Sequence, residues 1–320
     1  MKQHFRYATR INSFKARTDL HSWKEGKGSV LGLMDRMDLV KGLSGVFVNY
    51  PEHIAGPDGK VLKERIRDSP LEFYGWNIRF PEEFLDGGFT NPSPNIRSRA
   101  IDLCKRSVDD CRTWGGSEVV IWPALDGFDY PLQNDFETLW KHELEGIAAV
   151  AEYGKDLKIS IEFKPADPRR RCIFDSTATT LLAVNELGFQ NLGLTLDYCH
   201  VLMAKENPAL SAVHCLRQEK LFGMHMNDGN GFLDDGLMVG STTPWPTLEL
   251  VYYLLKYGFG GVLYFDTFPV REDPVAESES NIAQMESFAD LIETWDGPKL
   301  DELRASHDAL AILKLVGARK

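Results

Sequence analysis

Short apolar runs alternate with longer amphipathic stretches along nearly the whole chain. The apolar runs predict strands at residues 6–11, 45–50, 73–78, 118–123, 158–163, 192–197, 221–226 and 261–265. The stretches between them have apolar residues at helical spacing. They predict helices at 30–43, 96–114, 136–153, 177–187, 208–218, 247–257 and 277–295, with a further helix at 301–316. The second connection, residues 51–70, is rich in Pro and Gly and has only a short helical candidate near 63–67.

Strands that alternate with helices indicate parallel βαβ units. Eight such units in 320 residues favour a closed α/β barrel, the (β/α)8 TIM barrel with an additional C-terminal helix. We therefore expect one domain over residues 1–320, with the barrel at about 5–295 and a helical extension at about 296–320. No Gly-x-Gly-x-x-Gly motif follows the first predicted strand, so a dinucleotide-binding domain is not supported.

Composition and charge narrow the class of protein further. Hydrophobic residues make up 43% of the chain, yet no apolar run is long enough for a membrane helix, and the first ten residues lack the apolar core of a signal peptide. The net charge of −11 argues against nucleic-acid binding, which depends on basic residues. The five cysteines have no Cys-x-x-Cys spacing, so we expect reduced thiols and a cytoplasmic location.

Side chains that can bind a metal collect at the ends of the last four predicted strands. Glu162 and Asp197 end the fifth and sixth strands, and His225 and Asp266 end the seventh and eighth. Active sites of such barrels lie at the carboxyl ends of the strands, where consecutive strands are neighbours. One Asp at a strand end is commonly a helix N-cap, but four ligand-type residues in register predict a metal site.

The chemistry of this predicted quartet indicates which ions would fit. Three carboxylates packed together would raise one another's pKa values, and a divalent cation removes that repulsion. Three oxygen donors and one imidazole suit Mn²⁺, Mg²⁺ or Co²⁺ better than a metal that prefers sulfur, and Mn²⁺ is the ion we expect first.

Three further residues are candidates for proton transfer or substrate activation. Lys164 lies two residues beyond Glu162, so strand alternation directs it to the same face, unless it forms a rim salt bridge with Asp167. His200 follows the sixth strand by one turn and points into the site or caps the next helix. His53, in the segment 51–70, is an acid–base residue or a surface histidine.

These motifs together resemble the xylose-isomerase-like barrel superfamily over about residues 5–295. The resemblance implies that Glu162, Asp197, His225 and Asp266 hold a divalent metal against the oxygens of a sugar, and that Lys164 is catalytic. The segment NDGNGFLDDG resembles the stretch that supplies a second metal site, through Asp234 and Asp235. It also implies substrate-binding roles for Trp122, Asp228 and Asp235.

A narrower resemblance concerns residues 122–136, 227–241 and the motifs IEFKPADPR and YFDTFP. They are similar to the larger subunit of bacterial C-glycoside deglycosidases, metal-containing barrels that pair with a small β-sandwich subunit and cleave the C–C bond of 3-oxo-glucosyl aromatic compounds. This implies a lyase in a hetero-oligomer with an exposed apolar interface. Residues 51–70 and 80–94 could supply that interface, through Phe80, Phe84 and Phe89, or could form a lid within one chain.

The alternative function is a metal-dependent aldose–ketose isomerase of the xylose or rhamnose isomerase type, using Lys164 and the metal for a hydride shift or an enediol. Both reactions need a polarised carbonyl and an acidified neighbouring carbon. The lyase also needs a general acid, either His53 or His200, with Lys164 or a metal-bound hydroxide as base. Ketose 3-epimerases usually carry Glu where Asp266 stands, which argues against epimerisation. A non-catalytic sugar-binding barrel is the third possibility.

Overall fold

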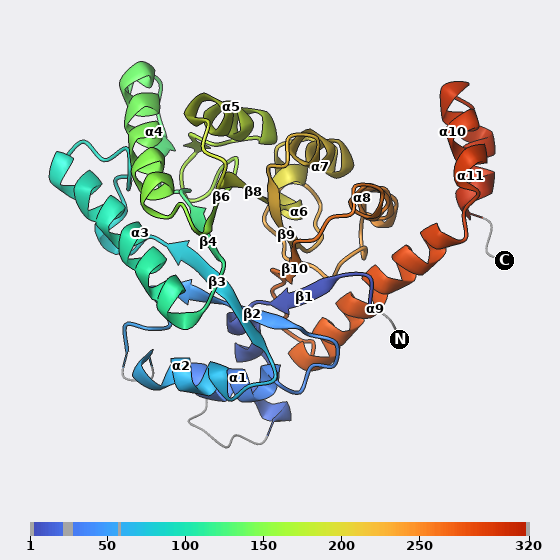
Figure 1. Cartoon of the computed structure of the whole chain (residues 1–320), viewed down its shortest axis with the longest axis horizontal. Coiled ribbons are helices and arrows are strands. Elements are labelled where there is room, and N and C mark those ends of the chain that lie inside the picture. The colour runs from blue at the N-terminus through green and yellow to red at the C-terminus, as the bar shows by residue number, and fades with distance from the viewer. Residues whose placement is uncertain (1–2, 22–27, 57–58, 318–320) are drawn as a thin grey trace.

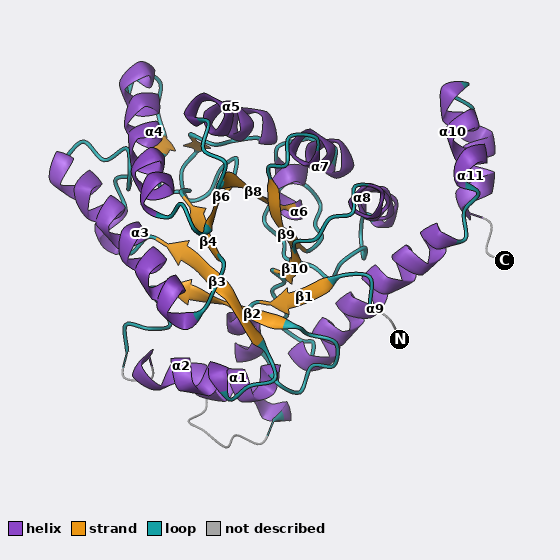
Figure 2. Ribbon diagram, viewed as in Figure 1, coloured by secondary structure: helices purple, strands orange, loops and turns teal. Residues whose placement is uncertain are grey.

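The computed structural model describes residues 3–21, 28–56 and 59–317, and its centre is a barrel of parallel strands (Figures 1 and 2). In the described residues eight strands follow the order β1-β10-β9-β8-β6-β4-β3-β2. This confirms the predicted (β/α)8 class. The strands are β1 (Arg6–Thr9), β2 (Gly45–Tyr50), β3 (Glu72–Arg79), β4 (Glu118–Trp122), β6 (Lys158–Glu162), β8 (Leu192–Asp197), β9 (Leu221–Met226) and β10 (Val262–Phe265).

The barrel closes between its first two strands through few contacts. Arg10 and Phe47 form an isolated parallel bridge. Nearer the amino ends of the two strands, the backbone amide of Ser44 donates to the carbonyl of Tyr7 at 2.9 Å, and the amide of Tyr7 donates to Ser44 Oγ at 2.8 Å. The other neighbouring strands are joined by parallel ladders, which shift register only in the β2–β3 and β8–β9 pairs. The β1–β2 seam therefore has the weakest strand pairing in the described barrel.

Helices cover the outside of the barrel in chain order (Figure 2). They are α1 (Val30–Met37), α2 (Gly59–Arg67), α3 (Pro94–Trp114), α4 (Phe136–Tyr153), α5 (Thr177–Leu187), α6 (Tyr198–Met203), α7 (Pro208–Leu216), α8 (Pro244–Lys256) and α9 (Pro274–Glu293). Short 3-10 turns lie at Ile11–Lys15, Thr18–Leu20 and Glu82–Phe84. The sequence reading did not predict α6, nor the small antiparallel pair β5 (Gly127–Phe128) and β7 (Arg171–Cys172).

Local sequence explains where these helices begin. The Asp135 side chain accepts a hydrogen bond from the Thr138 amide at 2.9 Å and caps α4, and Ser176 caps α5 in the same way. α3 ends at Gly115, whose φ of 79° is the left-handed conformation that favours glycine. None of the helices in the described residues is both long enough and apolar enough to span a membrane.

The prediction of one final helix at 301–316 is wrong, because the segment forms two. α10 (Gly297–Ala305) and α11 (Ala309–Gly317) are separated by a turn in which His307 has a φ of 55°. Asp308 Oδ1 accepts a hydrogen bond from the Ala311 amide at 3.0 Å and so begins α11 afresh. An Asp at this point competes with the continuing helix by capping a new one.

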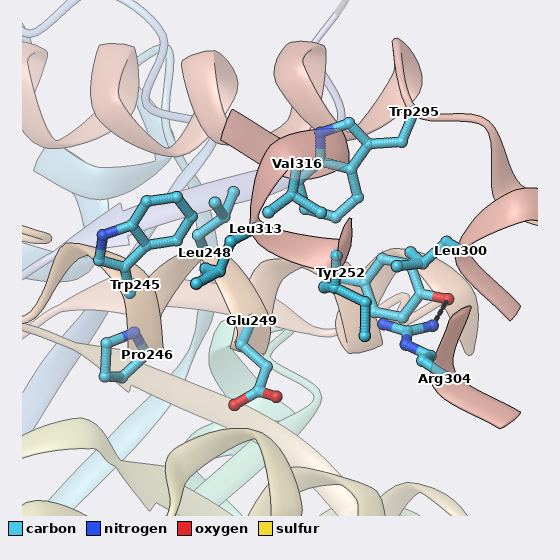
Figure 3. Close-up of a pocket in the computed structure, with 11 residues that line it drawn as sticks. Trp245, Pro246, Leu248, Glu249, Tyr252, Trp295, Leu300, Arg304, Leu313 and Val316 are labelled. Atoms are coloured by element: carbon cyan, nitrogen blue, oxygen red, sulfur yellow. Dashed lines mark hydrogen bonds between the residues drawn. The ribbon is translucent and has the colours of Figure 1, made fainter. Parts of the chain in front are cut away.

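The pair α10–α11, which we call the C-terminal arm, extends beyond the barrel from the end of α9 (Figure 1). Between the arm and α8 lies an apolar pocket of about 360 Å³, lined by Trp245, Tyr252, Trp295, Leu300, Leu313 and Val316 among others (Figure 3). Arg304 of the arm donates to the hydroxyl of Tyr252 in α8 at 2.6 Å. This pocket lies on the outside of the barrel, away from the predicted metal ligands.

The aromatic residues of the loop 80–94 are buried, which corrects the idea that they form an exposed interface. The Phe80 ring packs edge-to-face against those of Phe84 and Phe89, and all three belong to the main core. Asp126 holds the loop by accepting hydrogen bonds from the Thr90 amide at 2.8 Å and from its hydroxyl at 2.5 Å. The aromatic side chains of this loop therefore pack within the chain and do not form an exposed surface.

Candidate active site

The structure brings the four predicted metal ligands together at the carboxyl end of the barrel. Glu162 ends β6, Asp197 ends β8, His225 lies in β9 and Asp266 directly follows β10. One ligand atom from each of the four lies within 4.8 Å of the others, and all four side chains are buried. Strands that are neighbours in the sheet thus place them in one arc, as the sequence predicts.

Mutual electrostatics set the charge of this quartet. Burial favours the neutral form of Glu162, but the imidazoles of His225 and His200 outweigh it and lower its pKa. His225 Nδ1 lies 3.4 Å from Glu162 Oε2. For Asp197 burial is the dominant effect, and it raises the pKa. Crowded carboxylates of this kind are stabilised by a cation.

Unsatisfied polar atoms within the quartet fit a metal ion. Among the residues that the structure describes, His225 Nδ1 and Asp266 Oδ1 are buried without a hydrogen-bond partner. Buried polar atoms are nearly always hydrogen-bonded, so orphaned ligand atoms that converge on one point indicate a missing partner. Carboxylate oxygens and an imidazole nitrogen are donors for a divalent cation. The residues present therefore fit a divalent metal.

Asp197 combines the two roles that the sequence left open. Its Oδ1 accepts a hydrogen bond from the His200 amide at 3.0 Å and caps α6. Asn227 Nδ2 donates to Asp197 Oδ2 at 3.0 Å and to the Asp266 carbonyl at 3.2 Å. Asn227 therefore ties two members of the quartet together. It stands two residues after His225, a spacing that could have singled it out.

Lys164 and His200 meet at a carboxylate that sequence reasoning assigned to a second metal. Lys164 Nζ lies 3.0 Å from Asp234 Oδ2 and 3.3 Å from Asp167 Oδ2. His200 Nε2 lies 3.3 Å from the same Asp234 oxygen. Burial alone would lower the pKa of Lys164, but the carboxylates of Asp234 and Asp167 raise it. Both the predicted rim salt bridge and the inward position of Lys164 are therefore present.

His53 is buried beside the mouth, and its Nε2 lies 3.7 Å from the Glu52 carboxylate. The Asn49 amide approaches His53 Nδ1 at 3.3 Å as a donor, and His53 Nε2 lies 3.1 Å from Asn12 Oδ1. Burial lowers the pKa of His53 to about 4. An imidazole that accepts at one nitrogen and donates at the other is satisfied in its neutral form.

The three residues expected to bind substrate occupy different surroundings. The Trp122 ring lies between the Arg79 guanidinium, 5.4 Å from its centroid, and the Lys164 ammonium at 5.7 Å. The Asp228 carboxylate is fully buried and holds the amides of Thr242 and Thr243 at 2.8 and 2.9 Å. Asp235 Oδ2 accepts from the Asn230 amide at 2.7 Å. Trp122 faces the site, whereas the two carboxylates hold their own loop.

Comparison with known proteins places this geometry in a family. Residues 47–288 match the family model described as the xylose isomerase-like TIM barrel. The chain belongs to this family. Xylose isomerase from Thermus thermophilus is 26% identical over 203 residues, which are 62% of this chain and 52% of that enzyme. The chain thus aligns with about half the length of this curated relative.

Solved structures agree in fold. A D-tagatose 3-epimerase-like protein superposes with a TM-score of 0.69 and 18% identity over 89% of this chain and 99% of that one. The 3-keto-D-glucoside 4-epimerase from E. coli has a TM-score of 0.63 and 14% identity, covering 89% of this chain and 100% of that one. At these identities the likeness concerns the barrel and its topology.

Proposed function

We propose that the protein is a metal-dependent sugar isomerase that interconverts an aldose and its ketose. The observation that carries this proposal is the quartet Glu162, Asp197, His225 and Asp266, with Lys164 directed to the same mouth. The metal, when bound, would polarise the carbonyl of a chelated sugar and weaken the C–H bond of the neighbouring carbon. The match to a xylose isomerase favours isomerisation over the C–C lyase reaction that the sequence motifs suggested first.

The residues of the chain have separate roles in this proposal. Isomerisation moves a hydrogen from C2 to C1 of the sugar while a proton passes from O2 to O1. Lys164, ion-paired with Asp234 and 6% exposed, is placed to donate a hydrogen bond to the oxygen on which negative charge develops. Trp122 forms an apolar wall beside Lys164 and excludes water from that side. His200, facing the carboxylate of Asp234, is better placed to move a proton than the neutral His53.

The test uses the purified chain loaded with Mn²⁺ and a panel of simple aldoses. We expect ketose to form, and Lys164→Met to lower the rate by about 10²- to 10⁴-fold with the metal content unchanged. Lys158→Met is the matched control, because Lys158 lies in the same strand at the opposite, exposed end. His225→Ala should lose the metal as well as the activity. Full metal content in His225→Ala would reject the quartet.

A second candidate is the C-glycoside lyase with a small β-sandwich partner. The sequence segments 122–136 and 227–241 favour it, and so does the fold shared with an enzyme that acts on a 3-keto-D-glucoside. In this case the lone chain should be inactive on every aldose and should release aglycone from a 3-oxo-C-glucoside once the partner is added. Efficient turnover of an aldose by the lone chain would reject the lyase.

A further inference from the structure

Two arginines lie at the barrel mouth on strands that do not carry the metal quartet. Arg10 directly follows β1, and Arg79 is the last residue of β3. Arg10 Nε lies 3.4 Å from Asp266 Oδ1. The Arg79 guanidinium interacts electrostatically with Asp266 and Glu162, and both arginines act on His53. The two guanidinium groups therefore converge on the region above the quartet.

One donor of each guanidinium group has no hydrogen bond in the described part of the chain. The Nε atoms of Arg10 and Arg79 are buried without a hydrogen-bond partner, although Arg10 Nε faces Asp266 Oδ1 at the ion-pair distance of 3.4 Å. The Nε atoms of Arg65 and Arg169, in contrast, donate to Asp35 at 3.2 Å and to the carbonyl of Leu125 at 3.1 Å. Because buried donors are nearly always hydrogen-bonded, an unbonded Nε on each of two arginines at the mouth points to a ligand that is not part of the chain.

Aromatic rings fix the orientation of both groups. The Arg10 guanidinium carbon lies 4.6 Å from the centroid of the Phe268 ring, and that of Arg79 lies 5.4 Å from the Trp122 centroid. Such cation–π contacts hold a guanidinium over a ring while leaving its edge available for hydrogen bonds. The edge is the part of the group that recognises carboxylate or phosphate through two parallel bonds.

The charge of the mouth becomes compatible with an anion once a metal is bound. Five carboxylates, those of Glu162, Asp167, Asp197, Asp234 and Asp266, lie near the fixed cations of Arg10, Arg79 and Lys164. A divalent cation in the quartet would offset the excess of carboxylates. An anionic substituent of the sugar would then meet the two guanidinium groups without facing an uncompensated negative charge.

From this geometry we propose that Arg10 and Arg79 bind an oxyanion group, a carboxylate or a phosphoryl group, carried by the sugar substrate. The proposal rests on the proposed function, because it assumes that a sugar binds at the quartet. It names the substrate class as acidic sugars, either uronic acids or sugar phosphates. Arg10 and Arg79 are then specificity-determining residues, and Lys164 with the quartet performs the chemistry.

The test compares three probes that differ only at C6, namely D-glucose, D-glucuronate and D-glucose 6-phosphate. Their affinities for the Mn²⁺-loaded chain are measured by calorimetry at low ionic strength. We expect one of the two anionic sugars to bind at least about 10-fold more tightly than glucose, the effect of charge-assisted hydrogen bonds. Tighter binding of glucuronate would identify the group as a carboxylate, and tighter binding of the phosphate ester would identify a phosphoryl group.

Substitutions of the two arginines then test whether these residues cause the preference for an anionic sugar. Arg79→Gln and Arg10→Gln should each lower the affinity for the preferred anionic sugar about 10-fold or more, with the glucose affinity and metal content unchanged. Arg170→Gln is the matched control. This substitution removes the same charge, but Arg170 is exposed on the loop that also carries Arg169. In that variant the preference should persist.

Several results would overturn the proposal. One is equal or unmeasurable binding of both anionic sugars and glucose. Another is loss of metal in Arg79→Gln and Arg10→Gln, which would show that the arginines only hold the quartet together. Because binding is measured at equilibrium, these outcomes are distinct from failure of the isomerase proposal, which is the absence of turnover or of a metal that depends on His225.

Discussion

At the scale of single residues, His53 and His200 show how neighbours decide the state of one side-chain type. Both are buried beside the same mouth. His53 lies between the amide of Asn49 and the side-chain oxygen of Asn12. His200 lies among the carboxylates of Asp197, Asp234 and Glu162, which overcome the effect of burial and raise its pKa to about 9. The two histidines therefore respond to acid in opposite ways.

The state of His53 predicts a loss of stability in acid. Burial lowers its pKa to about 4 from the ordinary 6.5, so the unfolded chain binds more protons between these values. The associated stability is fully present above pH 6.5 and is lost as the pH falls toward 4. At pH 4.5 the loss is about 2–3 kcal/mol. Urea unfolding at pH 7.5 and 4.5 should show that His53→Gln loses less free energy of unfolding between these pH values than the parent chain does. A loss equal to that of the exposed-site control His214→Gln would contradict this.

Glu143 in α4 predicts the opposite dependence. Both of its carboxylate oxygens are buried and have no hydrogen-bond partner within the described ranges of the chain, and burial together with Asp126 raises its pKa well above the ordinary value. The stability associated with a neutral Glu143 is fully present below its unfolded pKa and declines as the pH rises. Glu143→Met should therefore unfold at a higher temperature than the parent chain at pH 8, with a smaller difference at pH 5. The exposed Glu145→Met should show no such pH-dependent gain.

At the scale of elements, hydrophobic periodicity predicted all eight barrel strands, with ends correct to within about two residues. The apolar runs at 45–50, 192–197 and 221–226 coincide with β2, β8 and β9. Periodicity failed where a polar residue competes for the backbone. Asp308 divides the final helix, and Asp197 starts α6, which is too short to show a period. Such capping depends on the conformation of the preceding turn, which apolar spacing does not encode.

The hydrogen bonds between β1 and the residue before β2 give a prediction about the stability of this seam. Ser44 Oγ accepts from the Tyr7 amide at 2.8 Å and donates to the Tyr7 carbonyl at 2.9 Å. Ser44→Ala leaves that amide without its partner, so the free energy of unfolding should fall by about 1–2 kcal/mol. Denaturant unfolding measures the change, with the exposed Ser241→Ala as control. An unchanged midpoint would show that the seam does not depend on this bond.

At the scale of the whole molecule, the metal quartet joins four βα units that are distant in sequence. Their convergence could be predicted because parallel strands in a barrel present their carboxyl ends at one mouth. The arginines could not be predicted in this way. Arg10 follows β1 and Arg79 ends β3, and only the folded barrel shows that their Nε atoms have no hydrogen bond to the described residues. Nor could the sequence show that Asp234, rather than Asp235, faces Lys164.

The position of the quartet predicts that a metal stabilises the entire barrel. A ligand that binds only the folded chain stabilises it by about 2.7 kcal/mol at a concentration 100 times its dissociation constant. Mn²⁺ should therefore raise the melting temperature after chelator treatment, and a scan with and without Mn²⁺ measures the rise. His225→Ala should abolish the rise, whereas His142→Ala, in helix α4, should retain it. Equal rises in both variants would place the binding elsewhere.

Asp197 both caps α6 and belongs to the metal quartet, so metal binding should affect the amide proton that it holds. Its Oδ1 holds the His200 amide, while the carboxylate as a whole belongs to the quartet. Anything that fixes this carboxylate also fixes the first turn of α6. The hydrogen-exchange rate of the His200 amide should therefore report occupancy of the quartet directly, slowing as the ion binds. One backbone proton would then measure metal affinity without any substrate or catalytic turnover.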